Sequence, residues 1–172
     1  WEQMGLITVT GGAMDFMNDY KFIVSHLAEL KERFDLNFLG IGIDPHNAAG
    51  VMQDLEALNT QDRPCGPVTI ITQSARNLND ATVAIQLLTK SGALEYDPGN
   101  ELLTWSMVNA AVVRNSFEEI KVDKKPGAKF KRIDPVDAII DAHALLLLTT
   151  GGEAAVNVDN EVENYLKLMG WS

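Results

Sequence analysis

Two aspartates of this chain stand where a carboxylate can do chemistry. Asp44 ends the apolar run FLGIGI (residues 38–43), and Asp134 lies in KRIDPVDAIIDAH (residues 131–143). Each is followed by proline, which is typical of a helix start with aspartate as the N-cap. The alternative for Asp44 is a metal ligand at the carboxyl end of a strand, where open α/β sheets place their sites. Both interpretations remain open from these stretches alone.

Three carboxylates share one face of the helix that begins near Asp134. At 100° per residue, Asp137 and Asp141 fall at about 300° and 340° from Asp134, whereas His143 falls at about 180°. Three like charges on so apolar a helix are costly unless they face water, cations or metal. Capping and the helix dipole explain Asp134 and Asp137 without any function, but they do not explain Asp141. A similar pair, Asp97-Pro98, sits among turn residues and is interpreted as a turn only.

A strip of basic residues leads into this helix. The stretch KVDKKPGAKFKR (residues 121–132) holds six basic residues against one acid, Asp123. One interpretation is a solvated hairpin, and the other is a strip that contacts phosphates. Acids from separate rigid elements suit Mg²⁺ or Mn²⁺, and two such ions about 4 Å apart can support phosphodiester cleavage.

Composition narrows the classes of protein that fit. The 172 residues suit one domain with an ordinary hydrophobic share of 46%, and the lone Cys65 excludes an internal disulfide. The net charge of −10 argues against a general nucleic-acid coat, so DNA contact would have to be local and salt-sensitive. No stretch is long enough to span a bilayer and no signal peptide is visible, which fits a cytoplasmic protein. Phosphate-loop, GxGxxG, HExxH and GxSxG motifs are absent, which disfavours a small-molecule α/β enzyme.

Strand and helix patterns alternate along the chain, which predicts an α/β protein with a mixed sheet. The predicted helices cover residues 14–34, 47–58, 78–92 and 134–148. The predicted strands cover residues 5–12, 35–43, 68–73 and 102–113, with a hairpin partner near 117–122. Residues 1–150 form the expected domain, and residues 151–172 are expected to be a tail or a short helix.

The order of three segments gives a family resemblance. GIDPHNAAGVMQDLE, then TIITQSARNLNDATVAIQLLTKSGALEYDPGNELLTWSMVNAAVVRN, then KPGAKFKRIDPVDAIIDA resembles the C-terminal nuclease domain of HK97-like tailed-phage terminase large subunits. The resemblance runs from about Gly5 to Ala144. It implies an RNase H-like mixed sheet flanked by helices and metal-dependent cutting of concatemeric double-stranded DNA with Mg²⁺ or Mn²⁺ in a two-metal site. It also implies the host cytoplasm and, as partners, an upstream ATPase domain, the portal and the small terminase subunit.

The resemblance also implies site residues. The family site uses three acids, of which Asp44 matches the second and Asp134 the third, and Asp137 is expected to join them at the metal. The first acid is expected on a strand upstream of GLITVT, which the given sequence would then lack. The expected DNA contacts are Lys124, Lys125, Lys129, Lys131 and Arg132. A rival hypothesis is a catalytically silent docking module that contacts the portal or the small subunit.

Overall fold

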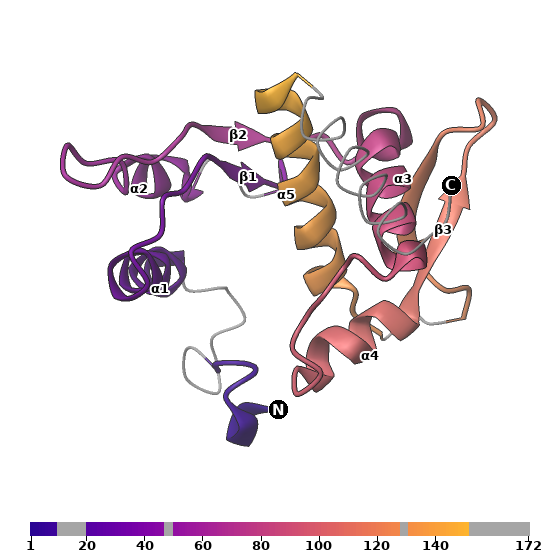
Figure 1. Cartoon of the computed structure of the whole chain (residues 1–172), viewed down its shortest axis with the longest axis horizontal. Coiled ribbons are helices and arrows are strands. Elements are labelled where there is room, and N and C mark those ends of the chain that lie inside the picture. The colour runs from indigo at the N-terminus through magenta and orange to yellow at the C-terminus, as the bar shows by residue number, and fades with distance from the viewer. Residues whose placement is uncertain (10–19, 47–49, 128–130, 152–172) are drawn as a thin grey trace, which may run out of the picture.

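The computed structural model describes residues 1–9, 20–46, 50–127 and 131–151 as a mixed α/β arrangement (Figure 1). In chain order the elements are η1 (Glu2–Met4), α1 (Tyr20–Arg33), β1 (Ile41–Ile43), α2 (Met52–Glu56), β2 (Val68–Ile70), α3 (Ala75–Ser91), α4 (Glu101–Asn109), β3 (Ala110–Arg114), β4 (Ile120–Lys124) and α5 (Asp134–Thr150). One pair of strands is parallel and the other antiparallel. The predicted α/β class with mixed strand directions is therefore confirmed.

The parallel pair sets the position of the candidate site. Strands β1 and β2 pair from Ile41 opposite Val68 to Ile43 opposite Ile70, and the Ile71 amide donates to the Ile43 carbonyl at 2.8 Å. Parallel strands need a crossover connection, which here contains α2. Because the two strands run in the same direction, the residues that follow them, Asp44 and Gln73, emerge at the same edge.

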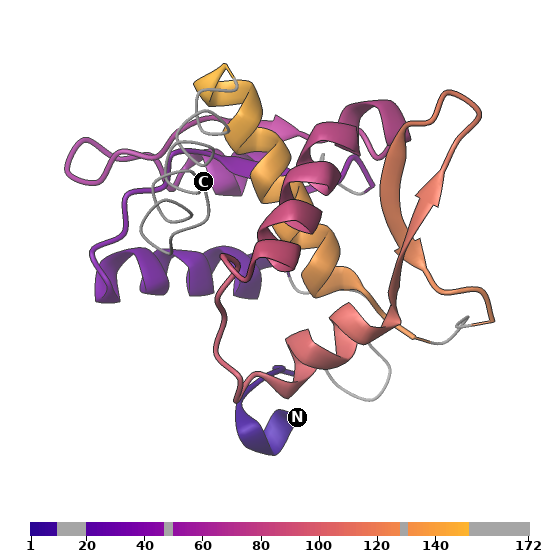
Figure 2. The same ribbon diagram turned by 45° about the vertical axis from the view of Figure 1, so that its right-hand side comes forward.

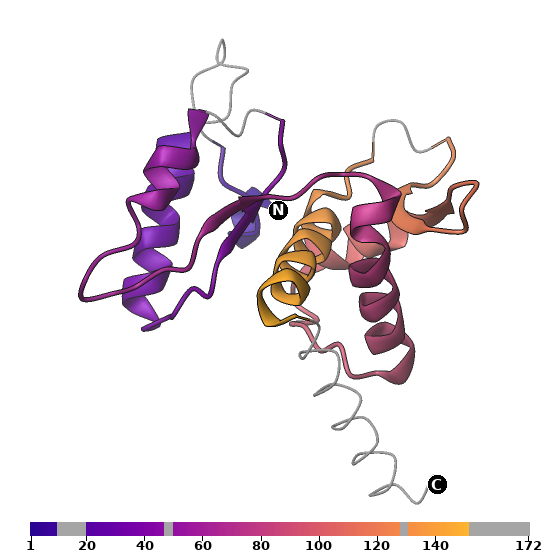
Figure 3. The same ribbon diagram turned by 90° about the horizontal axis from the view of Figure 1, so that it is seen from above.

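Two apolar clusters cover the two faces of the parallel pair (Figure 3). On one face, α1 and α2 pack on the strands through Val51, Leu55, Leu58 and their partly buried neighbours. On the other face, α3 and α5 pack through Ile71, Leu78, Ala81, Ile140, Ala144 and Leu145. Ile41, Ile43 and Val68 pack against the first cluster and Ile71 belongs to the second, while Ile70 of β2 remains 46% exposed.

Helix α5 lies directly on β1 because glycines face it. A β-carbon at Gly42 would stand 3.2 Å from the Asp141 carbonyl oxygen, and one at Gly40 would stand 2.9 Å from Leu145 Cδ2. Close approach of two backbones is a position where glycine is needed. The contact brings the Asp141 turn of α5 to the end of β1, where Asp44 follows.

The antiparallel pair forms a hairpin on the far side of α3. Strands β3 and β4 pair from Ala110 opposite Lys124 to Arg114 opposite Ile120. Figure 2 shows the hairpin at the outer edge of the molecule, and β4 packs against α3. The hairpin partner predicted near residues 117–122 is thus confirmed, and β4 carries the first lysines of the basic strip.

The prediction of a strand over residues 102–113 is wrong for most of its length. Residues 101–109 form helix α4, and the strand begins only at Ala110. The Asn100 side chain caps this helix, accepting a hydrogen bond from the Leu103 amide at 3.0 Å. Ser106 and Asn109, one turn apart, are both buried, so the segment buries a helical face that its β-rich composition does not suggest.

The strand predictions over residues 5–12, 35–43 and 68–73 are also wrong in whole or in part, and of residues 68–73 only Val68–Ile70 form a strand. Residues 5–9 contain no strand, because Gly5 takes a left-handed conformation (φ 69°) that ends η1, and residues 10–12 lie outside the described residues. Of residues 35–43 only Ile41–Ile43 pair as a strand, beyond an isolated bridge at Phe38. Helices α1 and α2 confirm the described parts of the first two helix predictions. Residues 14–19, 47–49 and 152–172, including the predicted tail, lie outside the described residues.

Candidate functional site

Asp44 lies at the carboxyl end of β1 and is exposed. Its Oδ1 accepts a hydrogen bond from the His46 amide at 2.6 Å, which makes a tight local turn. Helix α2 begins only at Met52, and its N-cap is Val51. Asp44 therefore does not cap α2, and the capping alternative fails for that helix.

The acids of α5 go from exposed to buried along the helix. Asp134 is exposed and is the first residue of α5, while the N-cap position belongs to Ile133, whose carbonyl accepts from the Val136 and Asp137 amides. Asp134 therefore favours the helix dipole without acting as the N-cap. Asp137 is half-buried, and Asp141 is only 9% exposed.

The pKa values show which carboxylates are neighbours. The pKa of Asp137 is raised from 3.8 to about 6, first by burial and then by the negative charges of Asp134, Asp141 and Asp123. Burial also raises the pKa of Asp141; the Gln73 hydrogen bond opposes this rise, and the Asp44 charge adds to it. Like charges and burial both disfavour the ionised form. Asp134, Asp137 and Asp141 follow one another along α5, and Asp44 follows β1, on which the Asp141 turn packs; we call these four acids the acidic row.

The structure shows how the predicted site residues are spaced, which the sequence patterns did not indicate. Asp44 is beside Asp141, whereas Asp134 begins the helix about 10 Å further along its axis. Within the described ranges, no group of three or more His, Cys, Asp and Glu side chains converges closely enough to hold a metal ion. The ion pairs of the described part of the chain join His26 to Glu29, Arg63 to Asp35, and Arg114 to Glu118, so none of them neutralises the acidic row.

The donor chemistry of the acidic row fits a hard divalent cation. Mg²⁺ is commonly held by one or two carboxylates, with water and substrate phosphates completing the shell. Asp44 and the α5 acids come from separate elements, β1 and α5, that pack directly against each other. Neighbouring carboxylates that form no ion pair among the described residues favour the binding of a cation from solution.

Gln73 is a site residue that sequence reasoning did not single out. It follows β2, and its Nε2 donates to the two oxygens of Asp141 at 2.9 and 3.1 Å. The sequence signal available was its place after a buried strand, at the same edge as Asp44. The 68 residues between Gln73 and Asp141 hide their contact from any local pattern.

The structure relates only some of the predicted DNA-contacting basic residues to the acidic row. Lys124 ends β4, and its charge acts on Asp137 to lower that pKa. The Lys125 side chain donates to the Val108 carbonyl, and its backbone amide donates to Asn109. Lys131 and Arg132 are exposed immediately before α5, and Lys129 lies outside the described residues.

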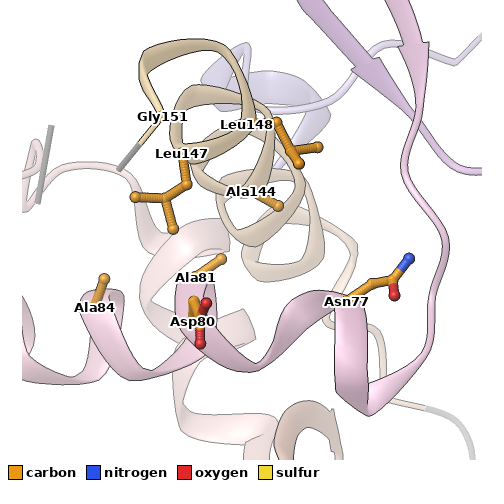
Figure 4. A pocket seen from close by; sticks show the side chains of 8 residues that line it. All are labelled: Asn77, Asp80, Ala81, Ala84, Ala144, Leu147, Leu148 and Gly151. Carbon is orange, nitrogen blue, oxygen red and sulfur yellow. The ribbon is translucent and has the colours of Figure 1, made fainter. Parts of the chain in front are cut away.

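A pocket lies at the opposite end of α5 from Asp134. It has a volume of about 450 Å³ and is bordered by α3 and α5 (Figure 4). Its lining consists of Asn77, Asp80, Ala81, Ala84, Ala144, Leu147, Leu148 and Gly151. None of the acids in the acidic row lines it, so the pocket is separate from the candidate site.

The fold agrees with a family that the sequence matches. The chain matches the family described as terminase large subunit, endonuclease domain, over residues 1–148, and it belongs to that family. It is similar to the crystal structure of the HK97 bacteriophage large terminase, with a TM-score of 0.67 and 25% sequence identity. That similarity covers 84% of this chain and 28% of the HK97 chain. The resemblance and the RNase H-like fold expected from the sequence are thereby confirmed.

Two further findings bear on the class. No curated protein matches this chain significantly. Among the described helices, none combines the length and the apolar character needed to cross a membrane.

Proposed function

We propose that this chain is a divalent-metal-dependent endonuclease that cuts concatemeric double-stranded DNA during viral genome packaging. The observation that carries the proposal is the acidic row, which joins the end of β1 to α5 in a member of the terminase endonuclease family. The similarity to the HK97 large terminase supports the same reaction class.

In this proposal Asp44 and Asp134 are the catalytic acids, and Asp137 joins them in holding Mg²⁺ or Mn²⁺. A pair of such ions supplies an activated water and stabilises the leaving oxygen of the phosphodiester. The protein contributes carboxylates fixed on β1 and α5, where burial and mutual repulsion raise the pKa of Asp137 to about 6. Binding of a cation favours the ionised form and lowers that pKa.

The proposed DNA contacts are phosphate contacts without base readout. They are Lys124, Lys125, Lys129, Lys131 and Arg132. Lys124 lies close enough to affect Asp137, and Lys131 and Arg132 adjoin Asp134 in sequence. Cations beside an acidic row offset the repulsion between carboxylates and a DNA backbone. Such contacts make binding strongly dependent on salt.

The remaining expectations concern the whole terminase. This chain spans only 28% of the HK97 large terminase chain, so they belong to the wider protein. We propose that the domain works with an ATPase domain of the same polypeptide, with the portal and with the small terminase subunit, in the host cytoplasm.

Cleavage of supercoiled plasmid tests the proposal. A form of the chain that also carries the expected first-strand acid should nick and linearise plasmid in Mn²⁺ or Mg²⁺ and be inactive in EDTA, and Asp134→Ala in that form is expected to lose this activity. Asp80→Ala on α3, an exposed acid outside the acidic row, is the matched control. Plasmid left intact in both metals by a folded protein would favour the docking module instead.

A further inference from the structure

We propose that Gln73 is a positioning residue that holds the Asp141 carboxylate beside Asp44 and makes Asp141 a contributor to divalent-cation binding. This inference rests on the proposed function, because it assigns two more residues to the same metal-binding edge. The sequence left open whether Asp137 or Asp141 lies at the metal site, and Gln73 was not among the expected site residues.

The hydrogen bonds of Gln73 fix the orientation of both side chains. Its Nε2 donates to the Ile71 carbonyl at 3.1 Å and to the Asp141 Oδ1 and Oδ2 at 2.9 and 3.1 Å. All three partners are acceptors only, so the amide nitrogen, rather than the amide oxygen, has to face them. The Asp141 carboxylate is therefore held against the end of β2 by a donor in a defined orientation.

The backbone around this pair is held by four elements. The Lys121 side chain on β4 donates to the Gln73 carbonyl at 3.4 Å. The Ser74 side chain accepts from the Asn77 amide and caps α3 directly after Gln73. On the other side, the Asp141 carbonyl packs against Gly42 of β1. The pair therefore sits where β1, β4, α3 and α5 meet.

The chemistry of the pair argues for more than packing. A buried carboxylate is usually paired with a cation, which cancels its charge. The Gln73 amide is neutral, so it satisfies the oxygens of Asp141 and leaves the negative charge in place. The charge of Asp44, the acid proposed to bind metal, contributes to the raised pKa of Asp141, so the two acids face the same edge of the sheet. The arrangement adds negative potential at the edge of the sheet, which attracts a cation.

The test separates a metal-binding role from a structural one by measuring Mn²⁺ affinity and thermal stability in parallel. Titration calorimetry gives the Mn²⁺ affinity, and thermal unfolding in EDTA gives the stability without metal. The variants are Asp141→Asn, Gln73→Leu and the double variant that combines Gln73→Glu with Asp141→Asn. The exposed residues Asp54 and Gln53 of α2 supply the controls Asp54→Asn and Gln53→Leu.

We expect Asp141→Asn to weaken Mn²⁺ binding roughly 10- to 100-fold, the range typical of partners just outside a metal shell. Gln73→Leu is expected to weaken it at least several-fold. The double variant keeps an amide–carboxylate hydrogen bond but moves the charge from α5 to the end of β2. Its unfolding temperature should therefore stay nearer to wild type than that of Gln73→Leu, while its Mn²⁺ affinity stays low.

The outcomes distinguish this inference from the proposed function. Wild-type Mn²⁺ affinity in Asp141→Asn and Gln73→Leu, with loss of affinity in Asp44→Asn, would overturn only the role of the Gln73–Asp141 pair. Wild-type affinity in Asp44→Asn as well, or no Mn²⁺ binding by the wild-type chain, would overturn the metal site on which both proposals rest. Restored affinity in the double variant would show that the negative charge attracts the cation from either side chain, and it would overturn the claim that the carboxylate has to lie on α5.

Discussion

Asp137 makes a prediction about stability that the structure allows to be worked out in detail. Its pKa is raised from 3.8 to about 6 by burial and by Asp134, Asp141 and Asp123. Between these two values the folded state binds more protons than the unfolded state. Stability therefore falls as the pH rises from about 4 to about 6, and the full cost remains at pH 7.

The magnitude follows from the size of the shift. A shift of about two pKa units corresponds to roughly 3 kcal/mol by linkage. Because Asp137 is only half-buried, solvent screening reduces the expected cost to roughly 1–2 kcal/mol. Asp137→Asn removes the charge with little change of shape, so it should stabilise the metal-free protein by about that amount at pH 7. This corresponds to a rise in unfolding temperature of roughly 2–8 °C.

Urea unfolding of wild type and Asp137→Asn in EDTA, from pH 4 to pH 8, measures the effect. The stability gain of Asp137→Asn should be near zero at pH 4 and should reach its plateau above pH 6. Mn²⁺ should reduce the difference in free energy of unfolding between Asp137→Asn and wild type at pH 7, since a bound cation stabilises the ionised wild-type carboxylate. A gain that is the same at every pH, or no gain at pH 7, would refute the assignment of Asp137 to a repulsive acidic row.

Three further predictions test the elements that place the site. Gly42→Ala puts a methyl group 3.2 Å from the Asp141 carbonyl oxygen and should cost roughly 1–3 kcal/mol in urea unfolding, so unchanged stability would contradict the close packing of α5 on β1. Asn100→Ala removes the side-chain cap of α4 and should cost about 1 kcal/mol, whereas an equal loss from the exposed Asn37→Ala would point to a non-specific effect. Replacing Lys131 and Arg132 together by glutamine should weaken DNA binding and flatten its logarithmic salt dependence by about 1.8, measured by fluorescence anisotropy. An unchanged salt slope would remove both residues from the proposed DNA contact.

The helices were predictable from the sequence where local signals agree. In α3, Gly92 takes the left-handed conformation (φ 74°) that its place after an apolar periodicity predicts. Helix α5 begins at the Asp134-Pro135 pair and buries its apolar face. The Asp97-Pro98 turn was equally readable, and Asp97 Oδ1 accepts from the Gly99 amide at 2.8 Å as a turn residue should.

The misplaced elements depend on tertiary contacts. Residues 102–113 are rich in β-formers, yet the Asn100 cap and the burial of Ser106 and Asn109 select a helix for the first part. Tertiary context of this kind regularly overrides propensity. The strand observed within residues 35–43 is shorter than predicted for a related reason, since only Ile41–Ile43 pair with β2.

The candidate site was predictable only in part. The strand-end position of Asp44 and the shared face of the α5 acids follow from periodicities of two and 3.6 residues. The placement of Asp141 near Asp44 does not follow from these patterns, because helix and strand periodicities do not say how closely two elements pack. The placement of Asp141 beside Asp44 depends on the absence of a side chain at Gly42, and the Gln73 contact depends on how β2 meets α5.

The most direct test is plasmid cleavage in Mn²⁺ by a form of the chain that also carries the expected first-strand acid, with Asp44→Asn compared with wild type and with Asp97→Asn as the matched Asp-Pro control. Asp44→Asn is expected to lose at least about 100-fold in cleavage rate, because the loss of a direct metal ligand should cost more than the roughly 10- to 100-fold typical of partners outside the metal shell. Asp97→Asn should cut like wild type, since Asp97 only holds a turn. Cleavage by folded Asp44→Asn at the wild-type rate would contradict the claim that the carboxylate after β1 binds the catalytic metal.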